Sequence, residues 1–254
     1  MRFEAKHKAL SKGEQKLLLT NTLVSGIMLG AVAAIIAFFL VMVQQGASLF
    51  DSLISFGWLS FFADGMLPDD LLTTGWWGFL VGPGVLLAVY CCLDLELSKN
   101  LKSYDADILE IRQGLTGELI ALDGKKLYPA MLFTNFFEEL LFRGTLIPLF
   151  LAILGVFGLV STPAALIASV VSALAFWFVH GQYRNKYSII TTVTLGIVLA
   201  WIYLWWGSVL VCLLAHFLYN VYVTSRERRL AVELDDYYGG EQPRTILTDM
   251  TTVK

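Results

Sequence analysis

The sequence predicts an all-α membrane protein, a polytopic bundle of about six transmembrane helices. Two observations support this fold class. Hydrophobic residues make up 57% of the 254 residues and charged residues only 15%, which is less charge than soluble domains of this size carry. The apolar residues also lie in long runs rather than in the one-sided periods of surface helices. Long runs are typical of helices in lipid, where no polar face is needed.

Six apolar runs reach or approach the ~20 residues that cross a bilayer as a helix. We predict spans at 17–43, 71–93, 127–155, 162–180, 187–205 and 207–224. The first run is too long for the core of a signal peptide, so we expect it to remain as an anchor helix. Interfacial helices would bring the total to seven or eight.

Two further segments are predicted at the membrane surface. The apolar stretch 48–66 is interrupted by Asp51, Gly57 and Asp64. It is therefore expected to form an interfacial or partly re-entrant helix, with a seventh span as the alternative. A weak helical period around 104–120 predicts a surface helix.

The distribution of Lys and Arg predicts the orientation of the spans. Basic residues are frequent before residue 17 and in the loop 94–126, whereas the loop 44–70 contains none. Short basic segments also follow the fourth and sixth spans. Because Lys and Arg accumulate in cytoplasmic loops, we expect both termini to be cytoplasmic.

The chain divides into three predicted parts. Residues 1–126 supply transmembrane helices and a cytoplasmic loop, residues 127–224 form a core that carries the polar groups, and residues 225–254 form a flexible cytoplasmic tail. The basic residues flank apolar spans instead of forming a face with aromatic residues. This distribution indicates no nucleic-acid partner.

Glu138, Glu139 and Arg143 are expected to be the only buried charged side chains, and all three lie in the third span. Each charge within a membrane costs about 2.5–3.5 kcal/mol on insertion scales. Glu139 and Arg143 are spaced to pair as carboxylate and guanidinium. Glu138 is rotated by about 100° from Glu139 around the helix, which leaves it free to face another helix. The alternative is a charged cluster that only joins helices.

Two histidines and an asparagine make a functional site the stronger interpretation. His180 ends the fourth span, and His216 lies midway along the sixth, with Asn220 one turn further on the same face. Glu138 lies about 16 Å from the cytoplasmic end of its span. We therefore expect these four residues to converge on a site that opens to the cytoplasm. His7 lies in the basic N-terminal arm and is expected to be solvated.

Three motifs on separate spans together resemble the signature of the CPBP family. The segment 138–143 reads E-E-x-x-x-R, 176–180 reads F-x-x-x-H and 216–220 reads H-x-x-x-N. The family comprises type II CAAX prenyl endopeptidases, Abi proteins, and bacteriocin-processing or immunity proteins. The resemblance covers about residues 127–224. It implies an intramembrane endopeptidase that hydrolyses a peptide bond near the cytoplasmic membrane face.

The resemblance also implies a role for each matching residue. Glu138 would be the general base that activates water, supported by Glu139 and Arg143. His180 and His216 would position this water or bind a divalent metal such as zinc together with Glu138, as in a metalloprotease. Asn220 would stabilise the oxyanion. The chemistry of these residue types agrees with those roles, and the choice between a metal and no cofactor stays open.

The expected partners are the lipid bilayer and a peptide or protein substrate with a membrane-adjacent segment. The motifs of zincin-like and G-x-S-x-G hydrolases do not occur, and the spans hold no paired aspartates. Two alternatives to a CAAX-type protease remain. One is a non-enzymatic membrane immunity or protection factor, and the other is a transporter or proton relay.

Overall fold

The computed structural model describes residues 11–45, 57–68, 70, 75–113, 122–180 and 185–238. Predictions about His7 lie outside these residues. The described residues form helices and contain no β-strand. Six of the helical segments are long and apolar enough to cross a membrane, so the predicted all-α membrane bundle is confirmed.

The described helices follow one another in this order along the chain. They are α1 (Lys12–Gln45), α3 (Gly57–Asp64), the 3₁₀ turn η2 (Gly75–Trp77), α4 (Gly78–Asn100), α5 (Tyr104–Gln113), α7 (Gly124–Leu141), the π-helical turn η3 (Phe142–Leu146), α8 (Ile147–Val156), α9 (Ser161–Val179), α10 (Lys186–Trp206) and α11 (Val209–Tyr238). The third span consists of α7, η3 and α8 in direct succession.

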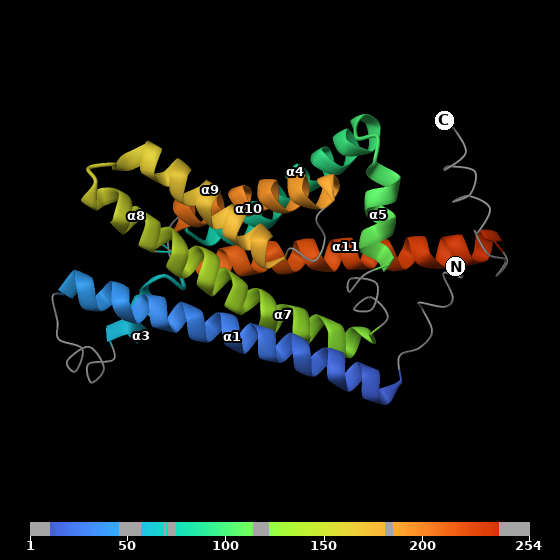
Figure 1. The fold of residues 1–254 in the computed structure, drawn as a ribbon, viewed down its shortest axis with the longest axis horizontal. Helices are drawn as coiled ribbons and strands as arrows, with labels where there is room; N and C mark the ends of the chain where they lie inside the picture. The colour runs from blue at the N-terminus through green and yellow to red at the C-terminus, as the bar shows by residue number, and fades with distance from the viewer. Residues whose placement is uncertain are drawn as a thin grey trace.

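Successive spans run in opposite directions through the bundle. Figure 1 shows the start of α1, helix α5 and the end of α11 at one end of the molecule, with α3 and the α8–α9 connection at the other. This alternation agrees with six crossings. That the first of these ends faces the cytoplasm stays a prediction from the charge distribution.

The described part of the stretch 48–66, residues 57–66, contains the short helix α3 and no seventh span. This helix has 8 residues, too few to cross the ~30 Å of hydrocarbon. The backbone amides of Val209 and Leu210 donate to the carbonyls of Gly65 and Met66, at 2.8 and 3.2 Å. The turn after α3 thus satisfies amides at the start of α11. Residues 48–56 lie outside the described residues.

Three helices differ in extent from their predicted ranges. α4 continues to Asn100, beyond the predicted end at residue 93. α11 continues to Tyr238, beyond the predicted span end at 224. The surface helix is present as α5 and ends at Gln113, with 114–121 outside the described residues. The flexibility of the tail stays a prediction, because residues 239–254 are also outside.

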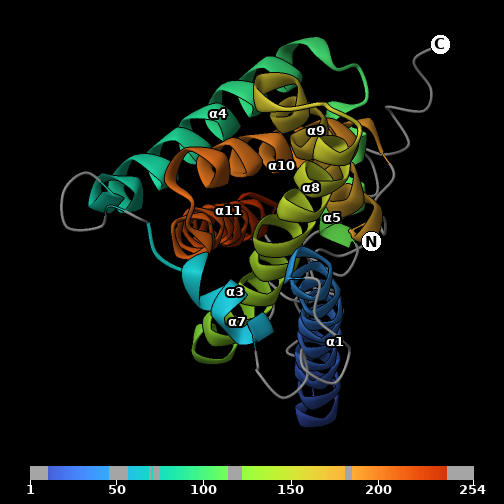
Figure 2. The ribbon, with the colours of Figure 1, turned by 90° about the vertical axis from the view of Figure 1, so that its left-hand side faces the viewer.

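α1 lies along α7, and the two helices are side by side in Figures 1 and 2. Gly26 allows this approach, since a Cβ there would lie 3.0 Å from the ring of Phe133. A Cβ at Gly30 would overlap the ring of Phe137. On the other side, α4, α10 and α11 share an apolar core that includes Leu86. α7 is therefore packed between the first helix and the later helices.

Candidate active site

The end of α7 and the π-helical turn η3 hold a fully buried ion pair. Arg143 Nη1 donates to Glu139 Oε1 at 3.1 Å, and neither side chain is exposed. Arg143 Nη2 also donates to the carbonyl of Gly196 on α10 at 3.3 Å. The guanidinium carbon lies 4.8 Å from the ring centroid of Phe176. The predicted pairing of Glu139 with Arg143 is confirmed.

The π-helical turn is stabilised by side-chain hydroxyls that bond to its backbone. Thr145 Oγ1 donates to the carbonyl of Leu140 at 2.8 Å, and Ser172 Oγ on α9 donates to the carbonyl of Phe142 at 2.7 Å. Gly144 in this turn has no room for a side chain, because a Cβ there would lie 2.9 Å from Val209. π-Helical turns often occur at functional sites in helices. No signal in the sequence predicted this turn.

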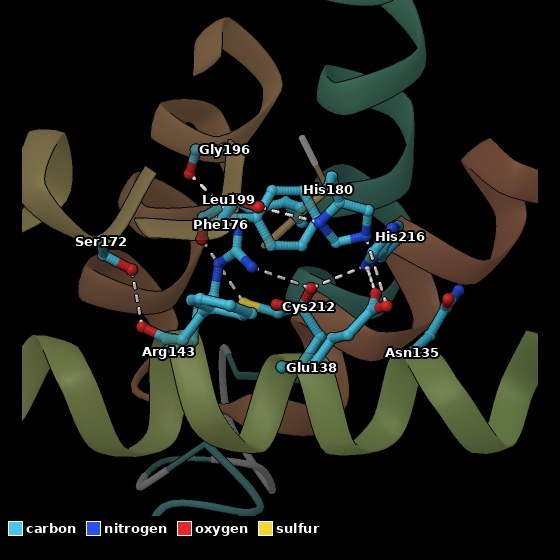
Figure 3. Close-up of polar contacts among 12 residues, drawn as sticks. Asn135, Glu138, Arg143, Ser172, Phe176, His180, Gly196, Leu199, Cys212 and His216 are labelled. Atoms are coloured by element: carbon cyan, nitrogen blue, oxygen red, sulfur yellow. Dashed lines mark hydrogen bonds and ion pairs between the residues drawn. The ribbon is translucent and has the colours of Figure 1, made fainter. Parts of the chain in front are cut away.

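Glu138 stands apart from the ion pair and faces two histidines (Figure 3). Its Oε1 lies 3.4 Å from His180 Nε2, and its Oε2 lies 3.8 Å from His216 Nδ1. Glu138 is 7% exposed. The structure thus brings together three predicted residues from α7, the end of α9 and α11.

His180 has one ring nitrogen fixed and the other directed at Glu138. Its Nδ1 lies 2.8 Å from the carbonyl of Phe176, so this nitrogen donates and Nε2 faces the carboxylate. The imidazole of His180 is thereby held with Nε2 towards the carboxylate of Glu138.

His216 is oriented by Glu139 rather than by Glu138. Its Nδ1 lies 2.7 Å from Glu139 Oε1, which also accepts from Arg143. Because a carboxylate only accepts, Nδ1 carries the hydrogen and Nε2 of a neutral ring has a free lone pair. The Glu139–Arg143 pair therefore holds His216 in one tautomer and one orientation.

Asn220 bonds to an asparagine that the sequence analysis missed. Its Nδ2 donates to Asn135 Oδ1 at 3.1 Å. Asn135 lies on α7, one turn before Glu138, and is 3% exposed. An amide buried in an apolar span is costly unless it is bonded, and this cost was the available signal for Asn135.

Four buried side-chain atoms in the described part of the chain lack a hydrogen-bond partner. They are Asn135 Nδ2, Glu139 Oε2, Arg143 Nε and Trp177 Nε1. The first three belong to the site, and Trp177 is next to Phe176 on α9. Buried polar atoms are rarely left unpaired in native proteins. Their concentration here indicates a place where water or substrate groups bind.

The donor types at this site suit zinc, but their arrangement does not form a metal site. Both Nδ1 atoms are engaged, so a metal would need Nε2 of His180 and of His216 together with Glu138. Within the described ranges, no group of three or more His, Cys, Asp or Glu residues is placed to hold a metal ion. We therefore derive no step through a metal.

The expectation that Glu138, Glu139 and Arg143 were the only buried charges was wrong. Asp94 on α4 and Asp107 on α5 are 7% and 8% exposed. Asp94 was missed because the predicted span ended one residue before it. It belongs to a second polar cluster, in which it accepts from Tyr104, Tyr187 and Arg226.

The fold and the site define a class: an integral multi-pass membrane protein with carboxylates and histidines buried between its helices. Residues 126–222 match the family model described as type II CAAX prenyl endopeptidase Rce1-like. This segment is therefore similar to that family, and it contains all six predicted site residues and Asn135. The predicted family resemblance is confirmed. Neither a curated protein nor a solved structure matches the chain.

The family is one of proteases, which supports a hydrolase of the CAAX intramembrane protease type at this general level. The match lends no support to metal dependence or to the Abi members of the resemblance. The family match by itself assigns neither the residues that perform the reaction nor its substrate.

Proposed function

We propose that this protein is an intramembrane endopeptidase in which Glu138 activates water to hydrolyse a peptide bond near the cytoplasmic membrane face. The observation that carries the proposal is the environment of Glu138. Its carboxylate is buried, unpaired with Arg143, and faces His180 and His216. A buried carboxylate that is not paired with a guanidinium is placed to accept a proton from a water molecule held beside it.

The reaction uses one water molecule and returns every proton. Glu138 accepts a proton from the water while its oxygen bonds to the peptide carbonyl carbon, whose oxygen becomes negative. His180 and His216 position the water, and Asn220 donates an N–H to the oxyanion. Glu138 then gives its proton to the amide nitrogen as the C–N bond breaks. The products are a carboxylic acid and an amine.

Glu139 and Arg143 act on the reaction through His216. Arg143 holds Glu139 Oε1 at 3.1 Å, and the same oxygen lies 2.7 Å from His216 Nδ1. This chain of charge-assisted bonds fixes the orientation of the His216 ring. We assign both residues as positioning residues.

The substrate that fits this site is a peptide or protein with a membrane-adjacent segment. His180 is the route of access that the geometry favours, since its side chain is 35% exposed while Glu138 beneath it is buried. It follows the end of α9, which is the end nearer to α5 and farther from the α8–α9 connection. A substrate segment would reach Glu138 from the predicted cytoplasmic side.

The test compares wild type with Glu138→Gln in detergent on a quenched peptide library. Removing the general base is expected to lower cleavage by about 10²–10⁴-fold. Glu96→Gln is the matched control, because Glu96 is an exposed glutamate on α4 that bonds only to Asn100 in the described residues. It should cleave like wild type.

Cleavage retained by Glu138→Gln would contradict the proposal. A parallel arm with a chelator reports on the zinc alternative, in which Glu138, His180 and His216 hold a metal. If no variant cleaves any peptide while Glu138→Gln still protects cells, the non-enzymatic protection factor becomes the better explanation.

A further inference from the structure

The two asparagines bridge the same helices as the contacts of His216 with Glu138 and Glu139. Asn135 lies on α7 one turn before Glu138, and Asn220 lies on α11 one turn after His216. α7 and α11 run in opposite directions, so both asparagines lie on the predicted cytoplasmic side of the carboxylates and His216. Figure 3 shows Asn135 and Glu138 rising from the same side of α7.

The distance along α7 between Asn135 and Glu138 suits one peptide group. A rise of 1.5 Å per residue places Asn135 about 4.5 Å from Glu138 along the helix. Water held by Glu138 attacks a carbonyl carbon, and the carbonyl oxygen must then point to a donor within a few ångströms. Asn135 lies within a few ångströms of Glu138 along α7. Its side-chain amide and that of Asn220 are donors of the type that binds an oxyanion.

The hydrogen bonding of the pair is incomplete. Asn220 Nδ2 donates to Asn135 Oδ1 at 3.1 Å, which leaves Asn135 Nδ2 buried with no partner. Asn135 as a whole is 3% exposed, so bulk water does not reach this amide. A pair that only joined two helices would have no reason to retain an unsatisfied donor, which costs about 1–3 kcal/mol.

We propose that Asn135 is a second oxyanion donor of this site. Its Nδ2 donates to the carbonyl oxygen that becomes negative during attack, and its Oδ1 orients the amide of Asn220, the first donor. The inference rests on the proposed peptidase function and extends it by one residue that touches the reacting atoms. Two donors on the oxyanion stabilise the transition state more than the ground state, so they act on kcat rather than on KM.

The experiment uses the peptide that the wild type cleaves in the library and the full-length protein in detergent. Asn135→Asp keeps an oxygen for Asn220 but loses the N–H donor, and Asn135→Leu loses both. Thr134→Val is the control on the same helix, because Thr134 Oγ1 bonds only to the carbonyl of Ala130 in the described residues. Each variant is measured for kcat, KM and thermal unfolding.

Loss of one oxyanion donor is expected to lower kcat by about 10²–10³-fold. KM should change little, and Asn135→Leu should unfold near the wild-type temperature, because removing the unsatisfied donor offsets the loss of the bond to Asn220. A peptide aldehyde, whose hydrate mimics the tetrahedral intermediate, should lose affinity in step with kcat. The corresponding peptide amide should bind unchanged.

Other results overturn the proposal in distinguishable ways. Wild-type kcat in both Asn135 variants, or a fall in kcat that follows a fall in thermal stability, would show that Asn135 is structural. If the wild type itself cleaves nothing, the peptidase function fails and this inference fails with it. If the wild type cleaves and Glu138→Gln does not, a failure at Asn135 concerns this residue alone.

Discussion

The protein buries two polar clusters that differ in how completely their groups are paired. The site cluster contains the acidic, basic and amide residues around Glu138. The second, here called the Asp94 cluster, joins α4, α5, α10 and α11. Its members are Tyr90, Asp94, Tyr104, Tyr187 and Arg226. Asp94 and Glu138 are both buried, and α11 contributes to both clusters.

Each oxygen of Asp94 has a partner. Oδ1 accepts from the hydroxyls of Tyr104 and Tyr187 at 2.9 and 2.8 Å, and Oδ2 accepts from Arg226 at 2.7 Å. None of the four unpaired buried atoms found in the described residues belongs to this cluster. The site cluster, by contrast, contains three of them. Complete pairing is what a structural clamp needs, whereas unpaired buried groups can still bind water or a ligand.

Arg143→Met gives the largest expected effect, because it leaves Glu139 as an uncompensated buried charge. Breaking a buried pair in this way costs about 3–5 kcal/mol of unfolding free energy. The double variant Glu139→Gln/Arg143→Met should recover most of that stability but not the cleavage activity. Unfolding and cleavage assays in detergent measure both quantities.

The comparison would be contradicted if the double variant regained full activity. It would then follow that the charges join helices without positioning His216. Equal stability of Arg143→Met and wild type would show that the ion pair is solvated.

Asp94→Ala is expected to destabilise the protein by about 2–3 kcal/mol, because hydrogen bonds to a charged group contribute strongly. Cleavage per folded molecule should stay at the wild-type level, since the Asp94 cluster shares no bond with the site cluster in the described residues. Asp94→Asn, which keeps an oxygen for both tyrosines, should lose less stability. A fall in kcat at full folding would remove the distinction between the two clusters.

The smallest of the expected effects is a pH dependence of stability that comes from Tyr104. Burial and its hydrogen bond to Asp94 raise the pKa of Tyr104 from 10.0 to about 12. The folded state therefore favours the neutral phenol. The stability that this preference contributes is fully present below pH 10 and is lost as the pH rises towards 12. Thermal unfolding of wild type and Tyr104→Phe at pH 9 and pH 11 measures it.

The wild type should lose more stability between these two pH values than Tyr104→Phe does. An identical loss in both proteins would mean that Tyr104 titrates alike in the folded and unfolded states. In that case the bond between Tyr104 and Asp94 is not maintained in solution.

Local features of the sequence predicted the structural features that depend on residues close together in the chain. Long apolar runs predicted the six crossing helices, because hydropathy and span length are properties of consecutive residues. The spacing of Glu139 and Arg143 predicted their ion pair, since residues four apart are neighbours on a helix. The motif resemblance predicted the candidate site residues, and the structure brings Glu138, His180 and His216 together.

Only the tertiary structure decided which of those residues touch. His216 and Glu139 are 77 residues apart, and Asn220 and Asn135 are 85 apart. Such contacts depend on how each helix is rotated and tilted against the next, which no single helix encodes. The same reason explains the Asp94 cluster, whose partner Arg226 is 132 residues away. The sequence by itself determined the helices and their charged pair, whereas packing determined the orientation of His216, the bond between the two asparagines and the clamp around Asp94.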